Sequence, residues 1–293
     1  MEQLKFVTSG LTTTRFKLFV DVFEDEVQRK IDKMGDSGTC DIFWTLADMI
    51  IFTASRCLLG EDIRRYLETK NLGTLYHDLD EGISPLSFFY PNLPQKKRDY
   101  AKKKISEIFQ ELIDTRRKDP TKRHDDVLDT LLHNEYKSGK AVPDSHIIGI
   151  LIAGLFAGQH TSSIASSWTL MNIINDKKLC ERVVKEQHEI IGGSDAKLEY
   201  EKVMQMDLLE RCLQEALRMY PPLIMLMRYV KKARRFENIV IPKGHVLVVS
   251  PSAAGRREEV FANPNEFDPE RFANPRREHE KVRHGYMAFG SGR

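Results

Sequence analysis

Cysteine is scarce in this sequence, with four residues in 293, and the four form neither a C-x-x-C pair nor a zinc-ligand spacing. Each falls in a stretch that reads as helical, so a disulfide framework is not expected and we interpret the thiols as reduced and cytosolic. They are Cys40, Cys57, Cys180 and Cys212. An excess of one charge is missing too, since 45 lysines and arginines face 43 aspartates and glutamates. This balance argues against a dedicated nucleic-acid binder, which concentrates positive charge on one face.

The first ten residues contain neither the apolar core of a signal peptide nor a transmembrane run. Hydrophobic residues make up 41% and charged residues 30%, which is typical of a globular protein and excludes a disordered or collagen-like chain. Internal repeats, low-complexity tracts and long linkers are all absent from the sequence. We therefore predict a single domain over residues 1–293.

Most of the chain carries the periodicity of α-helices. After Ala101 the apolar residues follow one helical stripe, and the neighbouring basic residues are predicted to form its solvated face. The stripe is Ile105, Ile108, Phe109, Leu112 and Ile113, and the basic residues are Lys102, Lys103, Lys104, Arg116 and Arg117. The preceding segment Gly82–Pro94 is aromatic and broken by proline, which indicates a loop or short helices.

Strand signals are confined to the last quarter of the chain. Residues 236–241 and 245–250 flank Pro242-Lys243-Gly244, a pattern that predicts a β-hairpin with a Pro/Gly turn. Residues 263–272 are rich in turn formers and are expected to be irregular. The predicted fold class is therefore mainly α with a minor β portion.

The most informative stretch is residues 147–174, which predicts one long helix. Its first half is apolar on every side, so we expect it to be buried, and it is too short and glycine-broken to span a bilayer. Small residues recur on one face of this helix, at Gly154, Ala157, Gly158, Thr161 and Ala165. This stripe indicates that something flat or close lies against the helix, either a neighbouring helix or a planar cofactor.

A polar cluster, Gln159-His160-Thr161-Ser162-Ser163, interrupts the apolar helix beside the small-residue stripe. A hydroxyl inside a helix bonds the carbonyl four residues back and loosens the ladder, and buried polar groups need partners. The cluster is therefore a candidate site, although a core histidine with satisfied hydrogen bonds has the same pattern.

Three shorter motifs follow. Glu215 and Arg218 share one face of a helix that ends at Pro221-Pro222, a pattern usually formed by a surface ion pair. The apolar run after the prolines ends in Arg228, which is either an anion-binding cation or the surface end of a buried strand. Arg271, in Pro269-Glu270-Arg271-Phe272, is able to complete a network with Glu215 and Arg218. The chain ends in Phe289-Gly290-Ser291-Gly292-Arg293, where the glycines permit close backbone approach.

The order of these motifs, FAGQHTSS, EALR, PERF and FGSGR, resembles that of the cytochrome P-450 haem-thiolate monooxygenases. Most of that superfamily has an acidic residue before the helix threonine, whereas A-G-Q-H-T carries His160 there, as in the sterol 14α-demethylase family. LDEGISPLSFFYPNLP, ASRCLLGEDIR and PPLIMLMR carry the same resemblance, which covers nearly the whole chain. It implies an incomplete P-450-like helical fold.

The resemblance also implies roles at matching positions. His160 and Thr161 are expected to be catalytic and to lie on the proton-delivery route. The haem b cofactor is expected to contact Ala157, Gly158, Arg228, Phe289, Gly290 and Arg293, with Arg228 paired to a propionate. Glu215, Arg218 and Arg271 are expected to form a structural triad. A flat, apolar sterol is expected to contact Ala153, Phe156, Leu223, Met225 and Met227.

The family reaction is the oxidative removal of the sterol 14α-methyl group, with electrons from an NADPH-cytochrome P-450 reductase. The resemblance places the parent enzyme on the cytosolic face of the endoplasmic reticulum membrane, held by an N-terminal anchor that precedes Met1. It places the iron-binding cysteine three residues beyond Arg293, and no other residue of the chain is expected to bind a metal. We therefore expect this polypeptide alone to be inactive.

Two other interpretations stay open at this point. One is a truncated protein that binds no haem and has no catalytic role. The other is a related monooxygenase that acts on fatty acids, xenobiotics or other lipids, against which His160 argues.

Overall fold

The computed structural model describes residue 6, residue 10 and residues 11–81, 93–119, 121–193 and 196–290. Within these residues the chain divides into two compact units, and each is described by itself. Unit 1 comprises residues 1–163 and 197–203, and unit 2 comprises residues 164–196 and 204–293. Of the predicted loop Gly82–Pro94, residues 82–92 lie outside the described residues, and Leu93 opens a helix.

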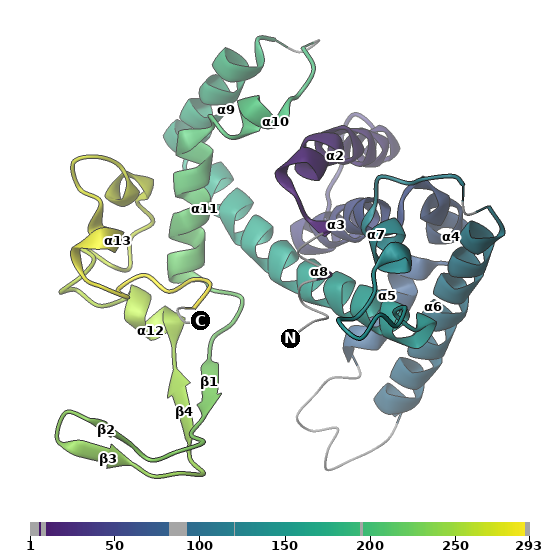
Figure 1. Ribbon diagram of the computed structural model, residues 1–293. Helices are drawn as coiled ribbons and strands as arrows, with labels where there is room; N and C mark the ends of the chain where they lie inside the picture. The colour runs from purple at the N-terminus through teal and green to yellow at the C-terminus, as the bar shows by residue number, and fades with distance from the viewer. Residues whose placement is uncertain (1–5, 7–9, 82–92, 120, 194–195, 291–293) are drawn as a thin grey trace. The chain divides into compact units, whose positions relative to one another are not determined.

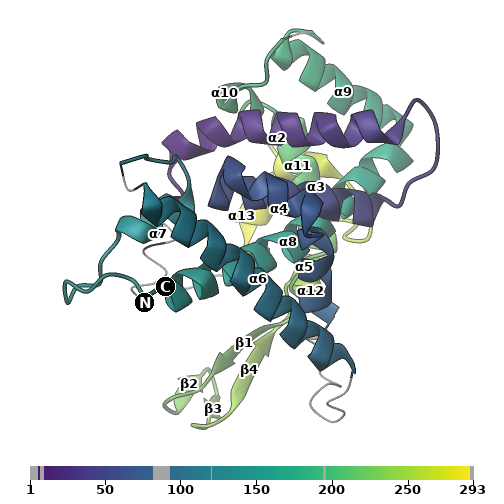
Figure 2. The same cartoon turned by 90° about the vertical axis from the view of Figure 1, so that its right-hand side faces the viewer.

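Unit 1 is built from helices (Figure 1). They are α2 (Thr13–Met34), α3 (Ile42–Leu59), the 3₁₀ turn η1 (Glu61–Ile63), α4 (Arg64–Thr69), α5 (Leu72–Glu81), α6 (Leu93–Lys118), α7 (Val127–His133), the first part of α8 (Asp144–Asn175) and α10 (Tyr200–Val203). Helix α2 packs beside α3 in both views (Figures 1 and 2). The segment 197–203 with the short α10 belongs to this unit, where Glu201 of α10 pairs with Lys17 of α2, and Lys197 before α10 pairs with Asp21 of α2 at 2.9 Å.

The core of unit 1 forms around the predicted stripe of α6. Ile105, Phe109, Leu112 and Ile113 are all fully buried, which confirms the periodicity argument, and they pack with residues of α3, α4, α5, α7 and α8. Burial of this apolar face stabilises α6 far more than its intrinsic propensity.

The predicted solvated face of α6 is wrong at Arg116. This side chain is buried, and its two terminal nitrogens each donate to Asp126 at 2.7 Å. One of them also donates to the Leu59 carbonyl. A Cβ on Gly60 would lie 2.3 Å from the Asp126 carboxylate, so glycine is required where α3 meets this ion pair.

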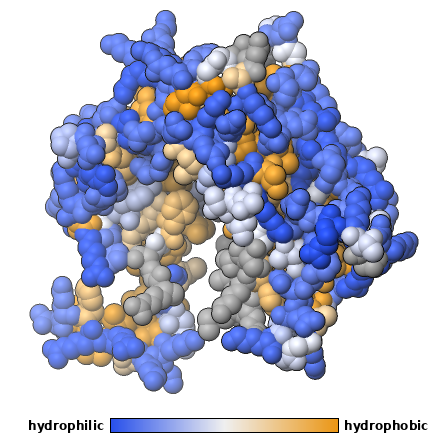
Figure 3. Space-filling view, turned by 45° about the horizontal axis from the view of Figure 1, so that its top comes forward, coloured by the Kyte–Doolittle hydropathy of each residue, from blue (hydrophilic) through white to orange (hydrophobic). Residues whose placement is uncertain are grey.

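Unit 2 contains the second part of α8, α9 (Lys177–Ile191), α11 (Asp207–Met219), α12 (Pro251–Gly255), the 3₁₀ turn η3 (Pro269–Phe272) and α13 (Glu278–Lys281). Its strands are β1 (Leu226–Tyr229), β2 (Arg234–Phe236), β3 (Ile239–Ile241) and β4 (Val246–Val249). A small apolar cluster joins α8, α9 and α11 through Ile173, Leu179, Val183, Leu208 and Cys212. On the face drawn in Figure 3 the surface is mainly hydrophilic, with hydrophobic residues visible in patches.

The predicted hairpin is wrong in its pairing, although both segments do form strands. β3 pairs with β2 and β4 pairs with β1, each antiparallel, so the strands on either side of Pro242-Lys243-Gly244 belong to different sheets. Glu237 adopts a positive φ of 49° and closes the β2–β3 turn with Asn238. This turn contains neither glycine nor proline, so the sequence carries little turn signal at residues 237–238. The stronger signal at Pro242-Lys243-Gly244 therefore predicts the hairpin turn in the wrong place.

Helix α8 confirms the long helix, but it is not buried on every side. Ile147, Leu151 and Leu155 are buried, whereas Ala153 and Ala157 are exposed. In the described part of the chain, α3 and α8 are long and apolar enough to cross a membrane, a test that core helices of soluble proteins also pass. The whole of α8 passes this test of length and composition, whereas the expectation concerned only the apolar first half of the helix.

The four cysteines are free, as predicted. Cys57, Cys180 and Cys212 lie in helices, but Cys40 lies just before α3 and is exposed, so its predicted helical position is wrong. Burial raises the pKa of the Cys57 and Cys212 thiols to about 12, so both are protonated near neutral pH.

Truncating the core of unit 1 tests its dependence on α6. We expect Phe109→Ala to lower the free energy of unfolding by about 3–5 kcal/mol, because Phe109 is fully buried and its loss leaves a cavity. Lys103→Ala, on the exposed face of the same helix, should change it by less than about 0.5 kcal/mol. Urea denaturation of both variants measures the difference, and equal effects would contradict the placement of the core.

Candidate functional site

The small-residue face of α8 lies open in the described structure. A Cβ placed on Gly158 would meet no atom within 4 Å, and one on Gly154 would touch only Leu58 Cδ1 at 3.9 Å. Ala153 and Ala157 on this face are exposed. Of the two predicted occupants, a neighbouring helix is therefore not seen among the described residues. A flat, unfilled helix face of this kind is suited to a planar group.

The polar turn beside this face keeps the helix intact. Thr161 Oγ1 donates to the Ala157 carbonyl at 2.8 Å, and Ser163 Oγ donates to the Gln159 carbonyl at 2.6 Å. The helix nevertheless runs unbroken from Asp144 to Asn175, so the predicted loosening does not end it. Because the Thr161 hydroxyl donates its proton to a backbone carbonyl, the lone pairs of its oxygen remain able to accept a hydrogen bond from water or another donor.

His160 borders a small pocket. The pocket has a volume of about 100 Å³ and is lined by Phe43, Trp44 and Ala47 of α3, His77 of α5, and Phe156, Gln159, His160 and Ser163 of α8. Phe156, predicted from the resemblance to contact substrate, thus lies half-buried at this pocket. Sequence reasoning missed His77 and Trp44, because nothing in their own segments distinguishes them from ordinary helix residues.

A second group of predicted residues meets in unit 2. Arg218 donates to both oxygens of Glu215, from Nε at 2.6 Å and from Nη2 at 2.8 Å. Arg271 Nε donates to Glu215 Oε1 at 2.8 Å, so one carboxylate is shared by two guanidinium groups. All three side chains are at most 1% exposed. The Glu215–Arg218 pair is therefore buried, and the common surface interpretation of E-x-x-R is wrong here.

The two arginines also hold the irregular segment between α12 and α13. Arg218 Nη1 donates to the Gly255 and Pro264 carbonyls, the latter at 2.8 Å, and Arg271 Nη1 donates to the Ala262 carbonyl at 2.8 Å. Residues 256–268 form no helix or strand, and turn hydrogen bonds within the segment reach some of their carbonyls, such as those of Arg257 and Asn263, while others accept from outside it. The buried guanidinium groups supply these donors.

Two further residues complete this network and were not predicted. Glu278, 3% exposed, accepts from Arg271 Nη1 at 2.8 Å and from the Ala262 amide at 3.2 Å. A Cβ on Gly255 would come within 2.5 Å of the Arg218 carbonyl oxygen, so only glycine allows α12 to approach α11 this closely. Glu278 stands in a charged run, and Gly255 lies beside two alanines, so neither carries a local signal.

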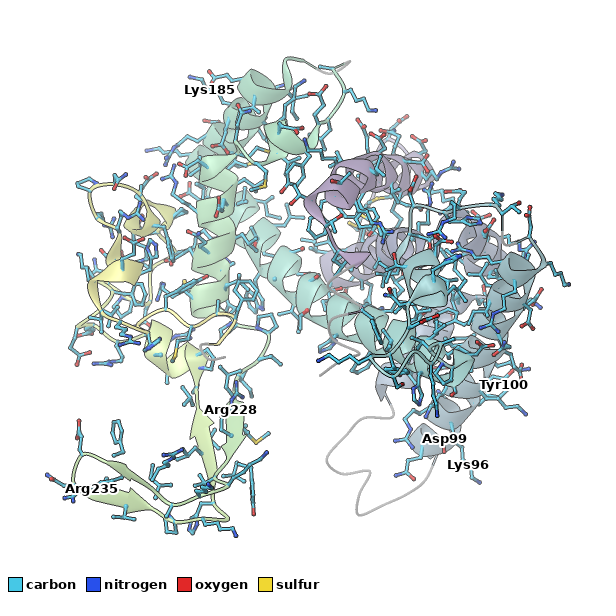
Figure 4. All side chains as sticks on the ribbon, in the orientation of Figure 1. Lys96, Asp99, Tyr100, Lys185, Arg228 and Arg235 are labelled. Carbon is cyan, nitrogen blue, oxygen red and sulfur yellow. The ribbon has the colours of Figure 1, made fainter. Side chains whose placement is uncertain are left out.

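The remaining predicted residues of unit 2 lie on or near β1. Figure 4 labels Arg228 on this strand, where it is exposed and donates to the Met227 carbonyl at 2.9 Å. Among the described residues no carboxylate pairs with it, so its charge is available to an anion. Leu223, Met225 and Met227 are each more than half exposed, which contradicts the alternative of a buried strand.

The C-terminal loop is described as far as Gly290. Phe289 is 88% exposed, and Gly290 adopts a φ of +76°, with its amide donating to the Met287 carbonyl at 3.0 Å. A Cβ on Gly290 would lie 3.3 Å from Leu226 of β1, so the loop passes close to that strand. Arg293, which is also predicted to contact the haem, lies outside the described residues. Among the described residues, no cluster of three or more histidine, cysteine or acidic side chains is able to hold a metal ion.

Comparisons with known proteins give one family. The Cytochrome P-450 family model matches residues 2–293. A sterol 14-demethylase of Arabidopsis thaliana is 41% identical over 302 residues, covering 100% of this chain and 61% of that protein. An obtusifoliol 14-alpha demethylase of Triticum aestivum is 39% identical, covering 100% and 66%, and a lanosterol 14-alpha demethylase of Homo sapiens is 36% identical, covering 100% and 58%.

The chain thus spans 58–66% of the length of these relatives. Among solved structures, a retinoic acid-bound cyanobacterial CYP120A1 matches with a TM-score of 0.87 at 22% identity, covering 98% of this chain and 64% of that one. At this identity the likeness shows the fold alone. It confirms the predicted mainly helical fold with its minor β portion.

Removing the shared carboxylate should destabilise unit 2 strongly. Glu215→Gln keeps the size of the side chain but leaves Arg218 buried without a counter-charge and Arg271 with Glu278 alone, so we expect the free energy of unfolding to fall by about 3–5 kcal/mol. The control is Glu189→Gln on α9, whose pair with Lys185 (Figure 4) is exposed at 3.7 Å and should contribute less than about 1 kcal/mol. Urea denaturation compares the two, and similar losses would show that the network is not buried.

Acid should weaken the same network. Burial raises the pKa of Glu278, but hydrogen bonds from Arg276 and Arg271 outweigh it and hold the pKa below its ordinary 4.5. The stability that Glu278 contributes is therefore complete above the unfolded-state pKa and is lost as the pH falls through the lower folded-state value. Thermal unfolding of Glu278→Gln should differ most from the parent at pH 6, and the difference should shrink towards pH 3. A constant difference across this range would contradict the assignment.

Proposed function

This chain belongs to the cytochrome P-450 family, and from that premise we propose that its activity is that of a sterol 14α-demethylase. The observation that carries the proposal is the A-G-Q-H-T turn, with His160 and Thr161 beside the open small-residue face of α8. Sterol, obtusifoliol and lanosterol 14-demethylases are its relatives at 36–41% identity over the whole chain, which supports the same substrate class.

The residues of each unit fit a haem b group in different ways. The face of α8 at Ala157 and Gly158 offers a flat surface on which no side chain is larger than a methyl group. A planar macrocycle is able to approach such a surface. Arg228, with no described carboxylate partner, fits a propionate. Phe289 and Gly290 are proposed as haem contacts, with Arg293 as a further one from the sequence. When bound, a thiolate-ligated haem supplies the activation of dioxygen.

The proposed contribution of this chain to catalysis is the handling of protons. Thr161 holds an oxygen with free lone pairs at the open face of α8, because its own proton goes to the Ala157 carbonyl. His160, one residue earlier, carries an imidazole, a group that is able to accept a proton at one ring nitrogen and to donate one from the other. The two residues together form the proposed proton-delivery route.

The substrate contacts are proposed on the same basis. Ala153 and Phe156 lie one turn before Ala157 and His160, and Leu223, Met225 and Met227 present exposed apolar side chains around the start of β1. Small, aromatic and methionine side chains suit a flat, apolar sterol. We also propose that the triad of Glu215, Arg218 and Arg271 supports the loop that holds the haem. Its two arginines donate hydrogen bonds to carbonyls of residues 255–264, in the segment that leads to this loop.

An NADPH-cytochrome P-450 reductase is proposed as the electron donor, and the endoplasmic reticulum membrane as the location, facing the cytosol. Both follow the resemblance to sterol 14-demethylases. The apolar character of α3 and α8 is compatible with a membrane but equally with core helices.

None of the four cysteines is proposed as the axial haem ligand. Cys57 and Cys212 are buried thiols with a pKa near 12, and Cys40 and Cys180 lie far along the chain from the Phe289–Gly290 loop. We therefore expect Met1–Arg293, expressed with haem available, to give no thiolate-type band in its reduced carbon-monoxide spectrum. A normal band would contradict this proposal, and Cys40→Ala and Cys180→Ala variants would then identify the ligand.

The sterol activity is tested on the full-length protein. Reconstituted with the reductase and NADPH, it should convert a 14α-methyl sterol to the demethylated sterol, detected by mass spectrometry. A fatty acid and a xenobiotic serve as alternative substrates. Conversion of these without sterol demethylation would favour the other monooxygenase interpretation.

The role of the turn is tested at Thr161. We expect Thr161→Ala to lower the turnover number about 100-fold, and Thr161→Ser to stay within about threefold of the parent, because serine restores the hydroxyl. The matched control is Thr169→Ala, which removes the same kind of hydrogen bond, to the Ala165 carbonyl at 2.7 Å, two turns further along α8. Equal losses in Thr161→Ala and Thr169→Ala would point to helix stability rather than proton delivery.

A further inference from the structure

Tyr220 lies where the strand segment of unit 2, residues 221–249, begins and where the chain returns after it. The chain leaves α11 at Tyr220, forms β1 to β4 and then enters α12. Directly after α12, Arg256 Nη1 donates to the Met219 carbonyl at 2.8 Å, and Arg256 Cζ lies 5.9 Å from the centroid of the Tyr220 ring. The residue before the strand segment is therefore in contact with the residue after α12.

A parallel ring stack joins Tyr220 to α8 as well. The centroids of the Tyr220 and Trp168 rings are 3.9 Å apart, and their planes differ by 9°. Both residues belong to unit 2. Stacking holds the planes of two rings in one relative orientation and is favourable beyond the area that it buries. Tyr220 is thus restrained by α8 and by Arg256 at the same time.

The backbone directly after Tyr220 has little other support among the described residues. The Tyr220 amide donates to the Ala216 carbonyl at 2.7 Å and ends α11, and residues 220–225 form no helix or strand. Pro221 and Pro222 have restricted φ angles and no amide hydrogen, so the direction of the chain here follows from the orientation of Tyr220. The next three residues are each more than half exposed, so apolar packing restrains them little; they are Leu223, Ile224 and Met225.

The pairing of β1 with β4 supports the other end of this stretch. The two strands are antiparallel, with Leu226 opposite Val249, and Figure 1 shows them side by side with α12 directly after β4. β4 leads to Ser250, the N-cap of α12, and Arg256 follows α12 and contacts the Tyr220 ring. The contacts therefore form a closed circuit from Tyr220 through β1, β4 and α12 back to Tyr220.

We propose that Tyr220, stacked on Trp168, is a positioning residue that places residues 221–228 for sterol binding. This proposal rests on the proposed function, since the sterol contacts proposed in unit 2 and the proposed propionate partner all lie within these residues. A binding segment that is held in place before the ligand arrives loses less conformational entropy on binding. Because Tyr220 acts through this segment and not on the reacting atoms, its loss should weaken sterol binding more than turnover.

The first test measures sterol binding and turnover in the full-length enzyme. Tyr220→Leu removes the ring from the stack, so we expect the sterol dissociation constant to rise at least about fivefold, while the turnover number at saturating sterol stays within about twofold of the parent. Tyr220→Phe keeps the ring and should restore the dissociation constant to within about twofold of the parent. An unchanged dissociation constant in Tyr220→Leu would overturn the proposal.

The matched control is Phe236→Leu, which removes a ring from an exposed site on β2 of the same strand segment. The described structure shows no ring contact for Phe236, so sterol binding should not change. An equal loss of affinity in Phe236→Leu and Tyr220→Leu would overturn the role of the stack. Loss of the reduced carbon-monoxide band in Tyr220→Leu would overturn it too, because the residue would then support the haem site as a whole.

A double-mutant cycle tests whether the stack with Trp168 carries the effect. Trp168→Leu should raise the sterol dissociation constant as Tyr220→Leu does, and the double variant should raise it no further, because both substitutions remove the same contact. Independent, multiplying effects of the two substitutions would contradict the proposal.

The second test needs no sterol. Hydrogen–deuterium exchange followed by mass spectrometry should show peptides of residues 220–229 exchanging at least about threefold faster in Tyr220→Leu, because their anchor is lost. Peptides of α9 and the Phe236→Leu variant should exchange as in the parent. Unchanged exchange at residues 220–229, or equal acceleration in α9, would overturn the proposal. If the parent protein neither binds nor demethylates a sterol, the proposed function fails, and this experiment still decides whether Tyr220 positions the segment.

Discussion

The buried carboxylate of Glu215 is the interaction on which unit 2 depends. It forms ion pairs with two guanidinium groups, those of Arg218 and Arg271, and Glu278 is a second carboxylate on Arg271. The two guanidinium groups then donate to carbonyls of a segment that forms no helix or strand. Burying a charge without a partner is very unfavourable, so the three side chains are arranged together or not at all. The irregular segment between α12 and α13 is held because several of its carbonyls accept hydrogen bonds from this buried network, in addition to the turn hydrogen bonds within the segment.

Helix α8 follows a different physical principle. Its buried face is ordinary, with Ile147, Leu151 and Leu155 in the core of unit 1. Among the described residues, no atom would meet a Cβ placed on Gly158 of its small-residue face. The three interior glycines, Gly149, Gly154 and Gly158, each lower the stability of the helix relative to alanine. This open turn, with hydroxyls and an imidazole beside it, is the basis of the ligand site proposed above. A pocket of about 100 Å³, lined in part by Gln159, His160 and Ser163, lies at the same turn.

Prediction from the sequence succeeded where the signal was local and failed where it depended on distant segments. The periodicity of α6 located its buried stripe correctly, because an amphipathic helix repeats its core face every three to four residues. The same pattern placed Arg116 in solvent, since Asp126 becomes its partner only when α7 folds back towards α6. The hairpin was mispaired for a similar reason, because strand pairing depends on which chain returns alongside, and the strong Pro/Gly turn at residues 242–244 is not the turn that closes a sheet.

The sequence by itself determined the helical class, the long helix with its A-G-Q-H-T turn, and the order of motifs that leads to the P-450 family. Each of these signals depends only on residues that are close together in the chain. Only the tertiary structure decided that Glu215 is fully buried, because E-x-x-R spacing puts both charges on one helix face whether or not anything covers it. It also brought Glu278 to Arg271 and His77 to the pocket at His160. Contacts of this kind join residues that are far apart in the chain, and no periodicity encodes them.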